Sequence, residues 1–132
     1  MAFLGKEYKL VKHENYDEFL KSLGLPNERV QEMLKNDETE KLVKNGDTYT
    51  FYYNSPSDKR EVTFTPGLEF VEFVEEGEPI KSTYTIDGNT VHQVSSGSDR
   101  VANFTREYDG DNLVVTMTCD KWDGVARAYY KA

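Results

Sequence analysis

The sequence predicts an all-β protein in which about ten antiparallel strands form an up-and-down meander, with two short helices near its start. Three observations predict this. From Glu40 onward, apolar and polar residues tend to alternate with a period of two, and turn-forming residues interrupt the pattern about every ten residues. Aromatic residues make up 13% of the chain, which favours strands. A meander of this many strands usually removes its exposed edges by closing into a barrel.

The bulk composition indicates one soluble domain spanning 1–132. A net charge of -8 disfavours nucleic-acid binding, which needs clustered Lys and Arg. The opening segment lacks the apolar run of a signal peptide, and no later stretch is apolar enough to span a bilayer. The single cysteine, Cys119, excludes an intramolecular disulfide and fits a reducing compartment. We therefore expect a cytoplasmic monomer.

Lys6 to Val11 reads as a first strand. Asn15 then stands where a helix N-cap belongs, with Glu18 three residues later as in a capping box. The first helix carries one apolar stripe and ends at Gly24; the stripe is formed by Tyr16, Phe19, Leu20 and Leu23.

A second short stripe follows at Val30, Met33 and Leu34. Both helices are too short to be stable alone, so they must pack against something larger. After Glu40 the turn signals begin with Asn45-Gly46, a dipeptide suited to a type I′ hairpin. Eight such breaks imply about nine strands after the helices and about ten in all.

Two strands carry an arginine on a face that also carries aromatic residues. On the last strand Arg127 and Tyr129 share a face, and Ala126, Ala128 and Tyr130 share the other. On an earlier strand Arg106 shares a face with Phe104 and Tyr108. Periodicity alone leaves open whether these arginines point inward or into solvent.

An inward guanidinium cannot lose its proton, so it needs an anion or water. No Asp or Glu lies on the same face within two residues of either arginine. A ligand could supply the missing anion, because two arginines and a tyrosine hydroxyl match a carboxylate well.

These residues resemble the binding set of a known family. Arg127-Ala128-Tyr129, with Arg106 upstream, is similar to the Arg…Arg-x-Tyr carboxylate site of intracellular lipid-binding proteins. The similarity runs the whole length of the chain, in family order. Its segments are Phe3-Leu4-Gly5, Tyr8-Lys9-Leu10, Glu14-Asn15-Tyr16-Asp17-Glu18-Phe19, Asn45-Gly46-Asp47, Gly67-Leu68-Glu69-Phe70 and Leu113-Val114-Val115. The chain is identified as resembling a cytosolic fatty-acid-binding protein of the insect gut type.

The resemblance implies a clam-like, ten-stranded calycin or lipocalin-like barrel with a two-helix lid over its portal. It implies non-covalent binding and intracellular transport of one long-chain fatty acid per chain, with no cofactor and no catalysis. Arg106, Arg127 and Tyr129 would hold the carboxylate, and arginine at both positions favours an acid over an alcohol. Phe104, Val115 and Met117 would line the cavity, with Cys119 beside them. Tyr16, Phe19, Leu20, Val30 and Met33 would contact the ligand tail or the portal.

Several alternatives stay open at this point. Retinoic acid or a bile acid is an alternative ligand, and an extracellular lipocalin-like carrier would need a signal peptide and usually disulfides. An enzyme using the same interior would need a base within reach of a bound substrate, and His13 and His92 lie far apart in the sequence. Lysines around the helices could touch anionic membranes during transfer, or simply be solvated. Ser57 stands where the family has its portal phenylalanine, and Trp122 has no assigned role.

Overall fold

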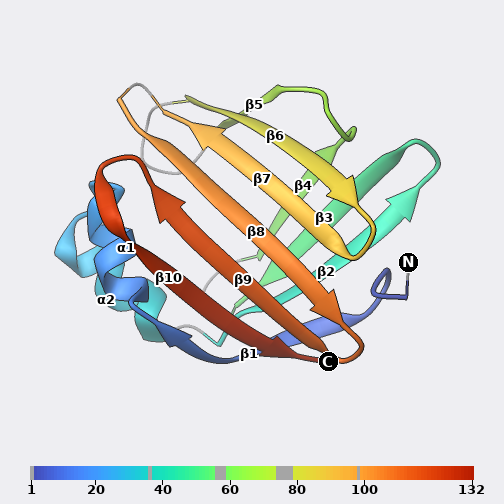
Figure 1. Cartoon of the computed structure of the whole chain (residues 1–132), viewed down its shortest axis with the longest axis horizontal. Coiled ribbons are helices and arrows are strands. Elements are labelled where there is room, and N and C mark those ends of the chain that lie inside the picture. The colour runs from blue at the N-terminus through green and yellow to red at the C-terminus, as the bar shows by residue number, and fades with distance from the viewer. Residues whose placement is uncertain (1, 36, 56–58, 74–78, 98) are drawn as a thin grey trace.

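Ten antiparallel strands form one sheet that curls round on itself, and two helices lie across one end of it (Figure 1). This is a computed structural model, and it describes every residue except 1, 36, 56–58, 74–78 and 98. The helices are α1 (Tyr16–Ser22) and α2 (Asn27–Lys35). The strands are β1 (Glu7–Glu14), β2 (Thr39–Asn45), β3 (Thr48–Asn54), β4 (Lys59–Phe64), β5 (Phe70–Phe73), β6 (Pro79–Asp87), β7 (Thr90–Ser96), β8 (Val101–Asp109), β9 (Asn112–Cys119) and β10 (Trp122–Lys131). The predicted all-β class, strand number and helix pair are confirmed.

The strand order is β4-β3-β2-β1-β10-β9-β8-β7-β6-β5, so the first and last strands meet in the middle of the sheet. Successive strands pair with each other, except that β4 and β5 form the two edges of the sheet. An ion pair spans these edges, because Arg60 Nη2 of β4 lies 2.7 Å from Glu72 Oε1 of β5. The barrel is thus joined here by side chains where backbone pairing stops.

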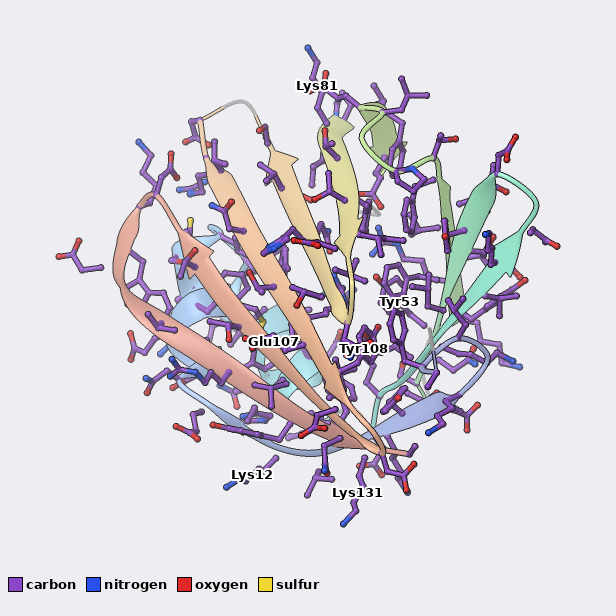
Figure 2. The ribbon with its side chains drawn as sticks, turned by 45° about the vertical axis from the view of Figure 1, so that its right-hand side comes forward. Lys12, Tyr53, Lys81, Glu107, Tyr108 and Lys131 are labelled. Atoms are coloured by element: carbon purple, nitrogen blue, oxygen red, sulfur yellow. The ribbon has the colours of Figure 1, made fainter. Side chains whose placement is uncertain are left out.

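Side chains divide cleanly between the inside and the outside of the curled sheet. Figure 2 shows Tyr53 and Tyr108 pointing inward, while Lys12, Lys81 and Lys131 point away from the molecule. Tyr108 is 6% exposed, whereas the three lysines are all exposed. This separation follows from the two-residue period of a strand.

Aromatic rings make up much of the interior. Phe3 stacks on Tyr108 with ring centroids 4.1 Å apart, and Tyr8 meets the same ring edge-on at 5.3 Å. Phe64 stacks on Tyr84 at 4.5 Å, in a second group from β4 and β6. Such rings bury large areas, and offset or edge-to-face pairs add roughly 0.5–1.5 kcal/mol each.

Helix α1 is held by what it covers. It packs against α2, β9 and β10. Phe19 is 1% exposed and meets Phe104 of β8 edge-to-face, with centroids 5.6 Å apart. The Phe19 ring also neighbours Trp122 at the start of β10, with centroids 6.3 Å apart. Because so short a helix is marginal by itself, this packing accounts for its stability.

The start of α1 differs from the predicted capping box. Asn15 has φ 56°, in the left-handed region, and its side chain makes no cap hydrogen bond. Its Nδ2 instead donates to the carbonyl oxygen of Val125, 3.1 Å away in β10. Asn tolerates this backbone conformation better than most residues, so Asn15 serves as a tie between helix and sheet.

Trp122 lies between the first helix and the sheet. Gly124, two residues further along β10, lies directly beneath the indole, and a Cβ at that position would collide with Trp122 Cζ2 and Cε2. The glycine therefore makes room for the indole against Phe19.

Candidate ligand-binding site

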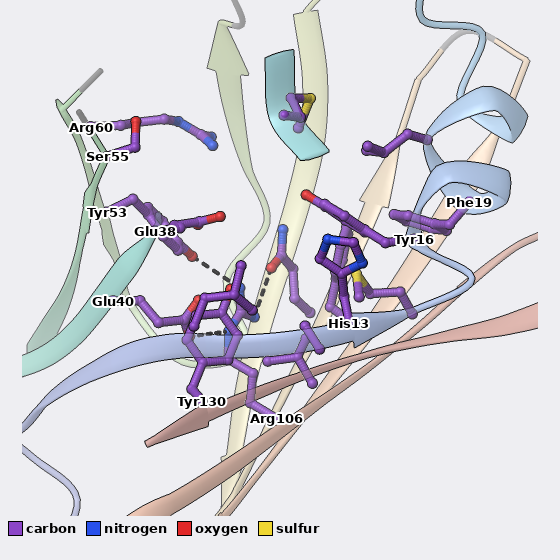
Figure 3. Close-up of a pocket in the computed structure, with 18 of the residues that line it drawn as sticks. His13, Tyr16, Phe19, Glu38, Glu40, Tyr53, Ser55, Arg60, Arg106 and Tyr130 are labelled. Carbon is purple, nitrogen blue, oxygen red and sulfur yellow. Dashed lines mark hydrogen bonds and ion pairs between the residues drawn. The ribbon is translucent and has the colours of Figure 1, made fainter. Parts of the chain in front are cut away.

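A pocket of about 530 Å³ lies between the helix pair and the inner face of the sheet (Figure 3). Helices contribute apolar side chains to one wall, including Phe19 and Met33. The sheet contributes Phe104 and Met117 opposite them. This size falls within the range of roughly 300–1,000 Å³ that is typical of small-molecule sites.

Most apolar residues expected at the site do line this pocket. They are Tyr16, Phe19, Leu20, Met33, Phe104, Val115 and Met117. Val30 is not among the lining residues; it is fully buried in the core cluster. Cys119 is also buried, and its Sγ lies 3.9 Å from the carbonyl oxygen of Ser22, beneath α1. Ser57, at the expected portal position, lies outside the described residues.

Arg106 points into the interior, as expected, and is 4% exposed. Its Nε donates to Glu40 Oε1 at 3.0 Å, its Nη1 to Gln93 Oε1 at 2.8 Å and its Nη2 to Tyr53 Oη at 3.1 Å. The guanidinium carbon also lies 4.6 Å from the centre of the Phe51 ring. The buried cation is therefore balanced by a carboxylate of the protein itself.

The expected inward orientation of Arg127 and Tyr129 is wrong. Arg127 is exposed and pairs with Thr116 of β9, on the outer face of the sheet. The Tyr129 ring carries Lys12 Nζ at 4.8 Å from its centre, also on the outside. The physical reason is register: Ala128 lies opposite Val115, which is itself opposite the inward Arg106, and directly opposed residues share a face.

The inner residues of β10 are consequently Ala126, Ala128 and Tyr130. Tyr130 is 7% exposed and lies near Glu40 and Arg106 (Figure 3). Burial raises the pKa of its hydroxyl well above the usual value, and the nearby Glu40 carboxylate adds to this. Only one arginine, among the described residues, is buried in the inner end of the pocket.

Sequence reasoning missed Glu40, Gln93 and Tyr53. The search for an anion near Arg106 covered only residues close in sequence, whereas Glu40 is 66 residues away. The alternation of apolar and polar residues along β2 and β7 could have identified Glu40 and Gln93 as inward-facing. Glu40 falls in phase with Leu42 on β2 and Gln93 with Val91 on β7, so each lies on an inward face.

A second acid lies close by. Glu38 also lines the pocket, just before β2. Burial, reinforced by the neighbouring Glu40 carboxylate, raises the pKa of Glu38 to about 7. Burial likewise raises the pKa of Tyr53 well above its usual value and that of Tyr84 to about 12, so both hydroxyls are neutral near pH 7.

A chain of polar side chains runs from Arg106 across the inner face. Gln93 Nε2 donates to Ser95 Oγ at 3.0 Å, and Ser95 Oγ lies 2.9 Å from Ser82 Oγ. Ser82 in turn donates to Glu72, the residue that pairs with Arg60 across the sheet edges. One hydrogen-bonded network therefore connects Arg106 in the pocket with the Arg60–Glu72 ion pair between β4 and β5.

Within the described residues, no three His, Cys, Asp or Glu side chains are grouped so that they could hold a metal ion. Neither described helix is long and apolar enough to cross a membrane. The arrangement is an apolar chamber with a polar end, which suits a ligand with one polar group and a long apolar body.

Comparison with known proteins agrees with this geometry. Residues 4–128 match the lipocalin / cytosolic fatty-acid binding protein family. Fatty acid-binding protein 2 of Manduca sexta is 48% identical over 132 residues, covering 100% of both chains.

Two solved structures are similar over nearly the whole chain. A fatty-acid-binding protein isolated from Manduca sexta has a TM-score of 0.92 and 47% identity, covering 98% of this chain and 99% of the other. A Schistosoma mansoni fatty acid binding protein, solved in complex with arachidonic acid, has a TM-score of 0.91 and 27% identity, covering 98% and 95%. The relatives are named as binding proteins, not as enzymes.

Proposed function

Because the chain belongs to the lipocalin / cytosolic fatty-acid binding protein family, we propose that it binds one long-chain fatty acid non-covalently and carries it within the cell. The observation that carries the proposal is the pocket of about 530 Å³, whose apolar walls lead to the buried Arg106. The acyl chain would lie against Phe19, Phe104 and Met117. The carboxyl group would lie at the inner end, near Arg106 and Tyr130.

The acyl chain supplies most of the proposed affinity. Burying roughly fourteen methylene groups at about 0.8 kcal/mol each gives on the order of 11 kcal/mol before costs. Association itself costs several kcal/mol of lost motion. A charged hydrogen bond contributes only about 1.5–3 kcal/mol net, so the polar end mainly sets orientation and the choice of head group.

The test is a pair of neighbouring substitutions, one on each face of β10. Delipidated protein is titrated with a fluorescent fatty-acid analogue, which palmitate then displaces. We expect one site per chain. Ala128→Phe should fill the pocket and weaken palmitate at least about tenfold, because Ala128 lines it beside Val115.

Arg127→Phe is the matched control, since Arg127 lies on the outer wall. It should leave palmitate affinity within about threefold of the parent. Far-UV circular dichroism and a thermal melt establish that both variants are folded. Absence of saturable palmitate binding in the parent protein would refute the proposed function. Loss of binding in Arg127→Phe alone would refute the assignment of the faces.

A further inference from the structure

At the inner end of the pocket, formed by Glu40, Gln93, Arg106 and Tyr130, the positive charge of Arg106 is already neutralised by the protein itself. Glu40 and Arg106 form an ion pair of 3.0 Å, with side chains 3% and 5% exposed. Gln93 and Tyr53 accept two further hydrogen bonds from the guanidinium. The buried cation Arg106 therefore already has its anion.

Among the residues that the structure describes, no second buried cation lies at this end. On β10 the inward positions are Ala126, Ala128 and Tyr130, and Arg127 lies outside. The remaining cations that line the pocket, Arg29, Lys59 and Arg60, come from α2 and β4. Arg60 pairs with Glu72, and Lys59 is exposed.

A carboxylate arriving at Arg106 would place two anions against one cation in a region removed from water. Two close carboxylates that share a buried site do not both stay ionised; the pKa of one rises strongly. Besides Arg106, the titratable groups that face Glu40 carry no positive charge. They are Tyr16, Glu38, Tyr53, Tyr108 and Tyr130.

We propose that Glu40 is the specificity-determining residue of this site: the inner end accepts an uncharged head group, or a fatty acid that takes up one proton and shares it with Glu40. This rests on the proposed fatty-acid function and refines its ligand class. The proton forms an O–H bond on the ligand carboxyl or on Glu40, and the hydrogen bond between the two oxygens replaces a repulsion between anions. Arg106 remains paired in either case.

The pH dependence follows from the proton balance. If the bound state holds one more proton than the free protein and free palmitate anion together, the association constant falls about tenfold for each unit of rising pH. A fatty alcohol of the same length brings no charge, so its association constant should not change over the same interval.

The experiment is titration calorimetry of delipidated protein with palmitate and with hexadecanol at about pH 8, repeated in buffers of different ionisation enthalpy. The dependence of the measured heat on the buffer enthalpy gives the number of protons taken up. We expect about one proton with palmitate and about none with hexadecanol. Uptake of less than about 0.2 proton with palmitate would overturn the proposal, because the ligand would then bind as an anion without compensation.

Two variants identify the residue responsible. Glu40→Gln should abolish proton uptake and tighten palmitate at least about tenfold, since Arg106 then lacks its internal anion. Hexadecanol affinity should stay within about threefold. Glu38→Gln is the matched control: it removes a neighbouring acid of the pocket and should retain the uptake. Proton uptake that persists in Glu40→Gln and vanishes in Glu38→Gln would transfer the role to Glu38 and refute the assignment.

The outcomes separate this inference from the proposed function. If palmitate binds the parent without proton uptake, only the role of Glu40 fails. If palmitate binds neither the parent nor Glu40→Gln, the fatty-acid function fails. If Glu40→Gln does not fold, the parent still decides the matter, because its palmitate affinity either falls with pH relative to hexadecanol or does not.

Discussion

Arg106 is 4% exposed and its partner Glu40 is 3% exposed, so each charge depends on the other. Removing one member leaves an uncompensated buried charge, a change that typically costs about 3–5 kcal/mol. Arg106→Met should therefore lower the free energy of unfolding by that amount in urea titrations. Arg127→Met, on the outer wall, should stay within about 0.5 kcal/mol of the parent.

The double variant sharpens this prediction. Arg106→Met with Glu40→Leu removes both charges and should recover most of the stability that the single change loses, because an apolar pair can replace a buried ion pair at little cost. Urea titration of the parent, Arg106→Met, Glu40→Leu and the double variant gives the coupling. A double variant no more stable than Arg106→Met would show that the pair is not the source of the loss.

The sequence alone did not determine whether Arg106 and Arg127 face the interior or solvent. Both share a strand face with aromatic residues, and the alternating pattern is equally compatible with either direction. Only the pairing of β8, β9 and β10 shows that Arg106 points inward and Arg127 outward, because it sets Ala128 and Arg106 opposite the same residue, Val115. β10 is irregular between Trp122 and Ala126, where four residues of β10 span two of β9, so its pairing with β9 cannot be counted from the turn.

At the scale of elements, the two edges of the sheet are joined by Arg60 of β4 and Glu72 of β5. Glu72→Gln should weaken this link and cost about 1–2 kcal/mol, because Ser82 can still donate to the remaining amide oxygen while Arg60 loses its charged partner. Hydrogen exchange should accelerate at β4 and β5 more than at β8 and β9. Glu61→Gln is the control, as Glu61 is exposed on β4.

The existence and the order of the helices and strands can be predicted from the sequence, since period-two stretches and turn residues are local signals. The residues at which the elements end are predicted less well. The first strand was predicted to end at Val11 and in fact runs to Glu14, because it pairs with β10 up to Arg127. The hairpin between β2 and β3 is confirmed, but a type I′ turn needs two central residues with positive φ, and among the described residues there only Gly46 has one.

The half-buried Glu38 of the pocket predicts how the stability of the protein changes with pH. The pKa of Glu38 is raised to about 7 in the folded protein, against 4.5 for an ordinary glutamate. The folded state therefore binds the proton more tightly than the unfolded chain does. The resulting stabilisation is fully present below about pH 4.5 and is lost as the pH rises through about 7.

We expect the contribution of Glu38 to fall between these pH values, and Glu38→Gln to remove that part of the dependence. Thermal melts of parent and variant from about pH 5 to about pH 8, compared as a difference, isolate this residue from the other carboxyls. A difference that does not vary with pH would contradict the assigned shift.

The indole of Trp122 gives the protein a built-in optical probe. It is the only tryptophan in the chain, and it lies against Phe19, a side chain that also lines the pocket. Ligand occupancy or displacement of α1 should therefore alter the intensity and wavelength of tryptophan emission, without any attached dye. Gly124→Ala, which pushes a methyl group into the ring, should shift the emission of the empty protein and weaken its response to palmitate. Rapid mixing of palmitate with the parent protein would then time ligand binding directly.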